Sequence, residues 1–496
     1  MSVCVHGVWV RCRCVTTDCG FIPKLVCVRT GLTESATSTA PEAAAAQPRS
    51  TRTRLAVSLR RSEEALSPRA LRKLLADLHG IAEARSDVEA AKQAEHLAHW
   101  YAQACPAERQ DFWLLLAEQF APDAELIECA RLQLDGAWGT QEQGAAEVRL
   151  RRALASPRGR LLQRFAAFEQ GMRFLVDLRG ELLQALPGDR RLLPLDAELE
   201  ALFTSWFELG SLRLDRISWD SPASLVEQLI QYEAVHDITS WADVKNRLDA
   251  DRRCYGFFHP RLPGVPLIFV EVAFGERMAD HMAPLLDEHA EPADLARATH
   301  AVFYSISNTQ PGLKGVSFGD SLIKRVVEAL QQDLPNVKHF ATLSPLPGFA
   351  RWLRAQAPER VAALPTKARQ ALADALGLEA EPPTGEAVLQ ALDQADLASW
   401  HEKSAARAWL LQMAAHYLVR EFSRGKPLDP VARFHLGNGA CVERLNWAAD
   451  LSVKGRRQSW GLMVNYLYDL KRLDKHRQAL AQEQVPASKA VLARLD

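Results

Sequence analysis

The stretch THAVFYSISNTQPGLKGVSFGDSLIKRVVEALQQDLPNVKHFATLS, Thr299 to Ser344, decides the fold that we expect for this chain. A run rich in β-branched and aromatic residues, a glycine-containing loop, an amphipathic segment and a second β-rich run follow one another. This order predicts a strand, a crossover helix and a second strand. One face of the helix should pack on the sheet, because its apolar residues recur at helical spacing: Leu322, Ile323, Val326, Val327, Leu330 and Leu334.

The loop before the predicted helix is a candidate phosphate-binding site. It contains Gly312, Gly315 and Gly319, and Asp320 and Ser321 stand where the helix begins. At a helix N-terminus, flexible backbone and a capping residue leave free N–H groups and the positive end of the helix dipole for an anion. The glycine spacing is neither the Rossmann nor the Walker pattern. The alternative is therefore a crossover whose glycines only make a tight turn.

Length and charge limit the possible functions. The 496 residues are enough for two domains, and 60 basic residues against 61 acidic ones leave a net charge of −1. This balance gives no reason to expect nucleic acid or an anionic membrane as the principal partner. No apolar run reaches the roughly 18 residues of a transmembrane helix, and no secretory segment is evident. We expect a soluble, cytoplasmic protein, with the mitochondrial matrix as the alternative compartment.

The first 61 residues differ from the rest. Residues 28–60 are rich in Ala, Thr, Ser, Arg and Pro and have no periodic hydrophobic residues, so we expect a disordered leader over residues 1–61. A mitochondrial transit peptide or an upstream start codon chosen in error are alternatives. The early cysteines lack the paired C-x2-C spacing of a zinc site, and we expect no metal site and no disulfide framework: Cys4, Cys12, Cys14, Cys19 and Cys27.

From about residue 62 to 185 the signals are helical. Ser67 and Pro68 form an N-cap and first-turn pair, and we expect Gly80 to end the helix that they open. Apolar residues recur over Leu161–Leu178 as in one long amphipathic helix. No pattern here indicates chemistry. The region is typical of a helical bundle used for packing or subunit contact.

The sequence pattern changes near Trp206, and we expect strands from Arg252 onwards. The runs CYGFFHP and PLIFVEVAF predict two neighbouring strands joined by a turn. Residues 350–403 are rich in Ala and Leu, with a break expected at Pro358 among other prolines, and predict a helical insertion rather than part of the sheet. A longer helix should follow over Ser404–Phe422. These patterns predict helices followed by a sheet domain, the α+β class.

Two residues are candidates for chemistry. His435 follows a proline-limited segment and precedes a Gly-x-Gly turn, so we expect it in a loop where it could meet a ligand, although a structural role is equally open. Ser344 ends a predicted strand and enters a proline-rich loop. His236 and His259 are competitors for a catalytic role. The chain has neither a G-x-S-x-G elbow nor an HExxH cluster, which argues against a hydrolase triad and a catalytic metal.

Several segments together resemble malonyl-CoA decarboxylase. They are FYSISNTQPGLKGVSFG at 303–319, FATLSPLPGF at 340–349 and DPVARFHLGNGACVERLNWAADLS at 429–452. Upstream, WFELGSLRLDRISWDSPASLVEQLIQYEAVH and RRCYGFFHPRLPGVPL fit the same family. The resemblance covers about residues 65–475, and separate motifs in the right order make it far more specific than a glycine pattern.

The resemblance implies an all-α helical bundle over residues 62–205, used in oligomerisation. It implies a GNAT-like catalytic domain with a mixed sheet, of the acetyltransferase superfamily, over residues 206–496, with residues 350–403 as a helical insertion. The implied substrate is malonyl-CoA, and the implied assembly is a homo-oligomer, with a tetramer as the expected number. No metal or organic cofactor is implied.

The family's functional residues map onto this sequence. The serine of the S-P-x-P-G-F motif and the histidine of the F-H-L-x-N-G-A motif correspond to Ser344 and His435, the implied catalytic pair. Ser305 falls at another active-site position, and Asn438 is a candidate to orient the His435 segment. The segment implied to hold the CoA pyrophosphate is Lys314, Gly315, Val316, Ser317, Phe318, Gly319 and Asp320. Some relatives carry a glutamate where this chain has Ser317, so no carboxylate role is carried over.

The implied reaction needs little machinery. Malonyl-CoA is a β-carbonyl acid, so the loss of CO2 leaves an enolate delocalised onto the thioester oxygen, which the enzyme must stabilise before carbon is protonated. His435 would donate the proton or hydrogen-bond that oxygen, and Ser344 would orient the substrate or relay the proton. The same fold class supports transfer of an acyl group from CoA to an amine, which is the rival activity. A CoA-binding protein without turnover is a second rival.

Overall fold

The computed structural model describes residues 2–5, 8–11, 66–316, 322–379 and 382–495. Residues Met1–Arg49 form a unit separate from Ser50–Asp496. In the first unit, strands β1 (Ser2–Val5) and β2 (Val8–Arg11) pair antiparallel. The rest of the leader expected over residues 1–61 lies outside the described residues. Among the described residues, no helix combines the length and apolar character that crossing a membrane requires.

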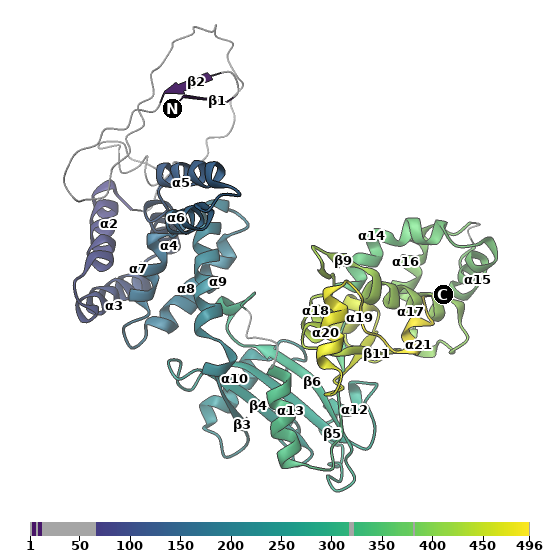
Figure 1. The fold of residues 1–496 in the computed structure, drawn as a ribbon. Helices are drawn as coiled ribbons and strands as arrows, with labels where there is room; N and C mark the ends of the chain where they lie inside the picture. The colour runs from purple at the N-terminus through teal and green to yellow at the C-terminus, as the bar shows by residue number, and fades with distance from the viewer. Residues whose placement is uncertain (1, 6–7, 12–65, 317–321, 380–381, 496) are drawn as a thin grey trace. The chain divides into compact units, whose positions relative to one another are not determined.

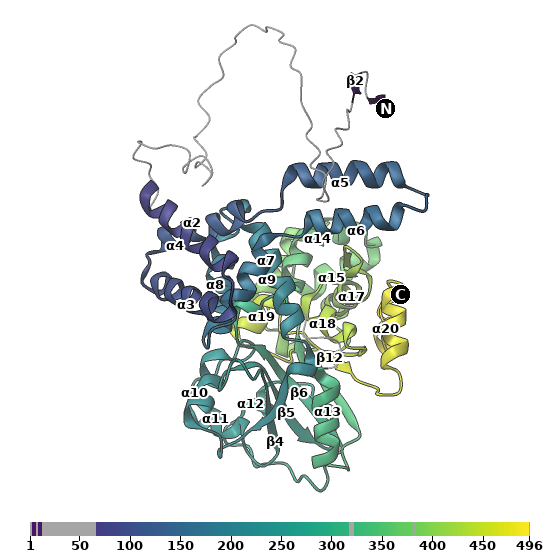
Figure 2. The same ribbon diagram turned by 60° about the vertical axis from the view of Figure 1, so that its left-hand side comes forward.

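The first part of the larger unit is entirely helical (Figure 1, and Figure 2 from a second side). Helix α2 is capped by Ser67, whose hydroxyl oxygen accepts from the Ala70 N–H, and Pro68 occupies its first turn as predicted. The helices of this part are α2 (Pro68–Glu83), α3 (Asp87–Gln103), α4 (Pro106–Gln119), α5 (Ala124–Ala137), α6 (Gln143–Leu154), α7 (Pro157–Phe165), α8 (Gly171–Ala185) and α9 (Leu193–Trp206).

Two expectations for the helical part are wrong. Helix α2 runs through Gly80 to Glu83, because the burial of Ile81 outweighs the roughly 1 kcal/mol that a glycine costs inside a helix. The apolar run Leu161–Leu178 forms two helices, α7 and α8, rather than one. The chain turns so sharply between them that a Cβ at Gly171 would lie 2.0 Å from the Phe165 carbonyl oxygen. Only glycine fits this close approach.

A mixed sheet of eight strands follows. The strand order is β11-β12-β7-β6-β5-β4-β3, with β8 paired to β12. Strands β6 and β7 are parallel and all the other neighbours are antiparallel. The strands are β3 (Arg213–Ile217), β4 (Arg252–Phe258), β5 (Pro266–Gly275), β6 (His300–Asn308), β7 (His339–Thr342), β8 (Ser344–Pro345), β11 (Cys441–Asn446) and β12 (Met463–Leu467). An all-α part followed by this sheet confirms the expected α+β class.

The described residues of the stretch Thr299–Ser344 form the predicted strand, crossover helix and second strand. Strand β6 is followed by a 3-10 turn (Pro311–Leu313), helix α13 (Leu322–Asp333) and the parallel strand β7. Five of the six apolar residues predicted to face the sheet are buried, while Leu334, just after the helix, is half-buried. Figure 1 shows α13 lying across the strands. Helices α10 (Ala223–Tyr232), α11 (Trp241–Arg247) and α12 (Ala283–Leu286) complete this half of the domain.

Helices dominate the chain after β8. They are α14 (Phe349–Ala362), α15 (Thr366–Leu376), α16 (Gly385–Gln394), α17 (Ala405–Arg420), α18 (Pro430–Gly437), α19 (Val453–Ser459), α20 (Leu473–Ala481) and α21 (Lys489–Leu492), with a short hairpin of β9 (Phe422–Ser423) and β10 (Lys426–Pro427). The break expected at Pro358 is wrong, because α14 continues through it while burying Ala357 and Val361. Helix α16 packs so closely there that a Cβ at Gly385 would lie 2.5 Å from the Pro358 nitrogen.

Candidate active site

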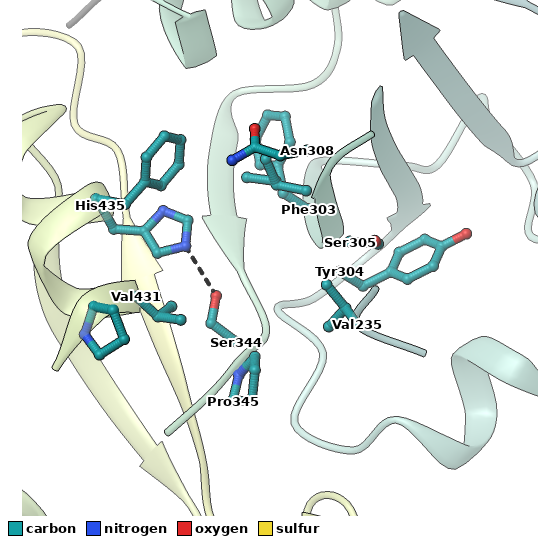
Figure 3. A pocket seen from close by; sticks show the side chains of 12 residues that line it. Val235, Phe303, Tyr304, Ser305, Asn308, Ser344, Pro345, Val431 and His435 are labelled. Carbon is teal, nitrogen blue, oxygen red and sulfur yellow. Dashed lines mark hydrogen bonds between the residues drawn. The ribbon is translucent and has the colours of Figure 1, made fainter. Parts of the chain in front are cut away.

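The candidate site lies where strands β6 and β7 separate. Their parallel pairing ends at Phe303 and Thr342, after which Ser344 pairs with Val464 of β12 instead. Ligands of open sheets bind outside the carboxyl ends of such strands. A cavity of about 240 Å³ opens here, which we call the dyad pocket. Its lining is Val235, Phe303, Tyr304, Ser305, Ile306, Asn308, Ser344, Pro345, Pro430, Val431, Phe434 and His435 (Figure 3).

Helix α18 carries His435 to this pocket, so the expectation of a loop is wrong. The Asp429 side chain caps the helix by accepting from the Val431 and Ala432 N–H groups, both at 2.9 Å, and Pro430 fills the first position. Gly439 follows the helix with a φ of +86°, a left-handed conformation that favours glycine. The caps hold a helix of only eight residues in place. His435 faces the pocket with 3% of its surface exposed.

A chain of hydrogen bonds runs through the site. Ser344 Oγ lies 3.2 Å from His435 Nε2, as Figure 3 shows, and donates to Thr342 Oγ1 at 2.8 Å. On the other side of the ring, His435 Nδ1 lies 2.8 Å from Tyr468 Oη. The buried phenol has no other hydrogen-bond acceptor among the described residues, so the network is satisfied when its O–H donates to Nδ1. Nε2 then carries the ring proton and donates it to Ser344 Oγ.

Burial makes the His435 ring neutral. Desolvation lowers the pKa of His435 to about 3, since no carboxylate compensates for the loss of water. The ring lies against Tyr466, with 4.6 Å between the ring centroids and 28° between the planes. Tyr466 is a residue of β12, and Tyr468 stands just past the end of that strand, where its ring meets the His435 ring edge-on with 6.1 Å between the centroids. The site thus presents a neutral, oriented N–H donor.

Ser305 lines the same pocket and is bound to a carboxylate. Ser305 Oγ lies 2.9 and 2.7 Å from the two oxygens of Glu233 and donates to that carboxylate. Glu233 also accepts from the N–H groups of Val235 and His236, at 2.6 and 2.9 Å. Since its proton is directed to Glu233, Ser305 offers the pocket an oxygen lone pair rather than a donor.

The predicted phosphate segment is described only in part. Lys314, Gly315 and Val316 are placed, and Gly315 has a φ of +84°. Ser317, Phe318, Gly319 and Asp320 lie outside the described residues.

Helix α8 fixes the base of this segment. Arg179 Nη1 donates to the carbonyl oxygens of Gly312 and Lys314, at 2.8 and 2.9 Å. The Arg179 guanidinium is itself buried and ion-paired to Asp196 at 2.8 Å. Gly312 lies so close to α8 that a Cβ there would be 1.8 Å from the Val176 carbonyl oxygen. The helical part of the chain therefore takes part in positioning the loop.

A second, larger cavity adjoins the dyad pocket. It has a volume of about 540 Å³, and we call it the outer pocket. Ile306, Asn308 and Phe434 line both cavities. Asn438 lines the outer pocket, where its Nδ2 donates to the Phe434 carbonyl oxygen at 2.8 Å while its buried Oδ1 has no hydrogen-bond partner among the described residues. Asn438 therefore stands at the C-terminal end of α18 and does not line the dyad pocket.

The competing histidines lie elsewhere. His259 packs edge-on against Phe207, with ring centroids 5.1 Å apart, and its Nδ1 accepts from the Arg261 N–H. His236 is buried outside the pocket lining, and desolvation lowers its pKa to about 4. Within the part of the chain that the structure describes, no group of three or more His, Cys, Asp or Glu could hold a metal ion.

Sequence reasoning did not find three residues of the site: Thr342, Glu233 and Tyr468. Thr342 could have been found, because it stands two residues before Ser344 in one extended run and so shares its side. Glu233 and Tyr468 are 72 and 33 residues from the side chains that they bind, so no local pattern connects them.

Two family models match the chain. The model of the malonyl-CoA decarboxylase C-terminal domain matches residues 210–496, and that of the malonyl-CoA decarboxylase N-terminal domain matches residues 120–207. The mitochondrial malonyl-CoA decarboxylase of Anser anser anser is 35% identical over 423 residues, 81% of this chain and 82% of the goose protein. That of Rattus norvegicus is 37% identical over 360 residues, 70% of this chain and 73% of the rat protein.

Solved structures agree. The crystal structure of malonyl-CoA decarboxylase from Rhodopseudomonas palustris is 41% identical with a TM-score of 0.73, and the match covers 85% of this chain and 98% of that one. The crystal structure of the protein of that name from Cupriavidus metallidurans is 44% identical with a TM-score of 0.70, covering 86% and 100%. These matches confirm the resemblance read from the motifs. The chain belongs to the malonyl-CoA decarboxylase family of carboxy-lyases.

Proposed function

We propose that this chain decarboxylates malonyl-CoA to acetyl-CoA and CO2 with Ser344 and His435 as its catalytic pair. The observation that carries the proposal is the 3.2 Å contact between Ser344 Oγ and His435 Nε2 at the wall of the dyad pocket. Membership of the family supplies the reaction class. The pocket supplies a small space for the acyl group beside one oriented donor.

The first step breaks the bond between the carboxylate carbon and the α-carbon. CO2 leaves, and the electron pair remains on the α-carbon as an enolate with its charge on the thioester oxygen. We assign the His435 Nε2–H as the hydrogen-bond donor to that oxygen, because a neutral, buried and fixed donor stabilises developing charge without reorganisation. The substrate oxygen would replace Ser344 Oγ as the acceptor of this hydrogen bond.

The second step protonates the α-carbon. The neutral His435 ring is a poor proton source, because losing its only N–H proton would leave an imidazolate. The hydroxyl of Ser344, released from His435 and 2.8 Å from Thr342 Oγ1, is the group placed to relay a proton to carbon. One proton from solvent restores the site in each turnover, so atoms and charge balance without a metal or organic cofactor.

The remaining site residues hold the substrate. Ser305, fixed by Glu233, lines the dyad pocket and orients the acyl group there. The buried Asn438 Oδ1 in the outer pocket is placed to accept from an amide N–H of the pantetheine arm. The segment from Lys314 to Asp320 would bind the CoA pyrophosphate through backbone N–H groups. We further propose that residues 62–205 mediate assembly of a homo-oligomer.

Incubation with malonyl-CoA alone tests the reaction. The CoA species are separated by chromatography, with and without an added amine. We expect acetyl-CoA to form at the same rate in both samples. Turnover that begins only when an amine is present would replace decarboxylation with acyl transfer, and intact malonyl-CoA in both samples would leave only a CoA-binding role.

A further inference from the structure

The outer pocket carries cations without matching acids. Lys426 of β10, Arg433 of α18 and Arg477 of α20 line it, and no Asp or Glu is among its described lining residues. The chain as a whole has a net charge of −1. The three positive charges around this pocket are therefore a local concentration and do not reflect a basic protein. A pocket lined by one sign of charge attracts and holds the opposite charge.

The three cations are available to a ligand. Among the described residues, Arg433 donates only to a neutral group, the Pro427 carbonyl oxygen, from Nε at 3.2 Å and Nη2 at 3.1 Å. Lys426 is exposed and makes no ion pair with the described residues. Arg477 has one distant ion pair, 3.7 Å to the exposed Asp474, and its buried Nε has no hydrogen-bond partner in the described part of the chain.

The position of the three cations identifies the ligand chemistry. The outer pocket shares Ile306, Asn308 and Phe434 with the dyad pocket, so a molecule whose acyl end fills the dyad pocket continues into the outer one. Val316, which belongs to the predicted phosphate segment, and Leu322, which follows that segment, line the outer pocket too. Arginine suits phosphate because its planar group donates two parallel hydrogen bonds.

We propose that Lys426, Arg433 and Arg477 form a second phosphate-binding wall for the CoA thioester, separate from the loop before α13. This inference rests on the proposed function for the identity of the ligand. Arg433 and His435 lie two residues apart on α18. Phosphate binding at this wall therefore steadies the same short helix that carries the catalytic histidine, and the remote end of the substrate contributes to the geometry at the reacting end.

Calorimetric titration tests the wall without turnover. CoA, 3′-dephospho-CoA and pantetheine are titrated into wild type, Arg433→Ala, Lys426→Ala and the control Arg472→Ala. Arg472 is an exposed arginine just before α20 that pairs with Asp469 and does not line the pocket. We expect Arg433→Ala to weaken CoA binding about tenfold or more and Lys426→Ala to weaken it severalfold. The affinity for pantetheine should stay unchanged in both variants, and Arg472→Ala should bind all three ligands like the wild type.

The three ligands separate the outcomes. If the substitutions weaken the binding of CoA but not that of 3′-dephospho-CoA, the three cations contact the 3′-phosphate. If they weaken the binding of both, the cations contact the pyrophosphate. Unchanged CoA binding in both variants, or an equal loss for CoA and pantetheine, would overturn the proposal. Lys426 is exposed, so we expect Lys426→Ala to fold normally. This variant therefore tests the proposal even if Arg433→Ala folds poorly. Absence of decarboxylation by the wild type would contradict the proposed function. The binding measurement does not depend on turnover, so it would still test the phosphate-binding wall.

Discussion

At the scale of single residues, burial strongly alters the chemistry of His435. Its pKa is lowered to about 3 by desolvation, so we expect the ring to stay neutral from pH 5 to 8. The ring resonance, identified by its loss in His435→Asn, should not titrate over this range in an NMR series. A midpoint near 6.5 would contradict the neutral-donor role.

The same pKa sets the sign of a stability effect. The folded pKa lies below the usual value of 6.5, so the unfolded chain takes up the proton first as the pH falls. The free energy of unfolding should therefore decrease as the pH drops from 6.5 towards 3. His236, with a pKa lowered to about 4, contributes in the same direction.

Tyr468 is a positioning residue, since it reaches the reaction only through His435. Tyr468→Phe keeps the ring but removes the donor to Nδ1, so the proton of the imidazole is no longer confined to Nε2. We expect kcat to fall about tenfold, the equivalent of one hydrogen bond of roughly 1.4 kcal/mol, with KM nearly unchanged.

Tyr466→Phe is the matched control for this variant. Tyr466 is two residues away, in strand β12, and its buried hydroxyl has no hydrogen-bond partner within the described ranges. It should keep wild-type kcat. Equal losses in the two variants would show that Tyr468 only fills space.

At the scale of elements, helix α18 depends on its N-cap residue, Asp429. The Asp429 carboxylate accepts hydrogen bonds from two backbone N–H groups and from the Tyr417 hydroxyl, the last at 3.0 Å. Asp429→Ala should lower the free energy of unfolding by about 1 to 2 kcal/mol and reduce kcat, because the helix that holds His435 loses its cap. Asp429→Asn keeps a side-chain oxygen that can cap the helix, so it should retain most of the stability and most of kcat. Denaturant unfolding and steady-state rates measure these effects, and an Ala variant equal to wild type would contradict them.

The elements also show which local signals suffice. Asp429, Pro430 and Gly439 are the cap, first-turn and C-terminal signals of a helix, so α18 could have been predicted where we expected a loop. The break between α7 and α8 could not, because it depends on the contact of Gly171 with the Phe165 backbone. Strands β4, β5, β6 and β7 were predictable from their apolar, β-branched runs.

At the scale of the whole molecule, sequence motifs and folded contacts contribute different parts of the site. The motifs predicted Ser344, His435 and Ser305, which the structure brings to one pocket. Glu233 and Tyr468 join them only through the sheet and helix α10, over sequence distances that no periodicity spans. Arg179 likewise connects the helical part to the loop before α13, although that part gave no sign of a functional contact in the sequence.

The measurement that tests the account most directly compares malonyl-CoA turnover with CoA binding in His435→Asn and Ser344→Ala. The account predicts that both variants lose about 10²-fold or more in kcat, while calorimetry shows CoA affinity like that of the wild type. Each variant then binds the substrate and fails only in the chemical step. Turnover near that of the wild type in either variant, with folding intact, would remove that residue from the mechanism and contradict the catalytic pair.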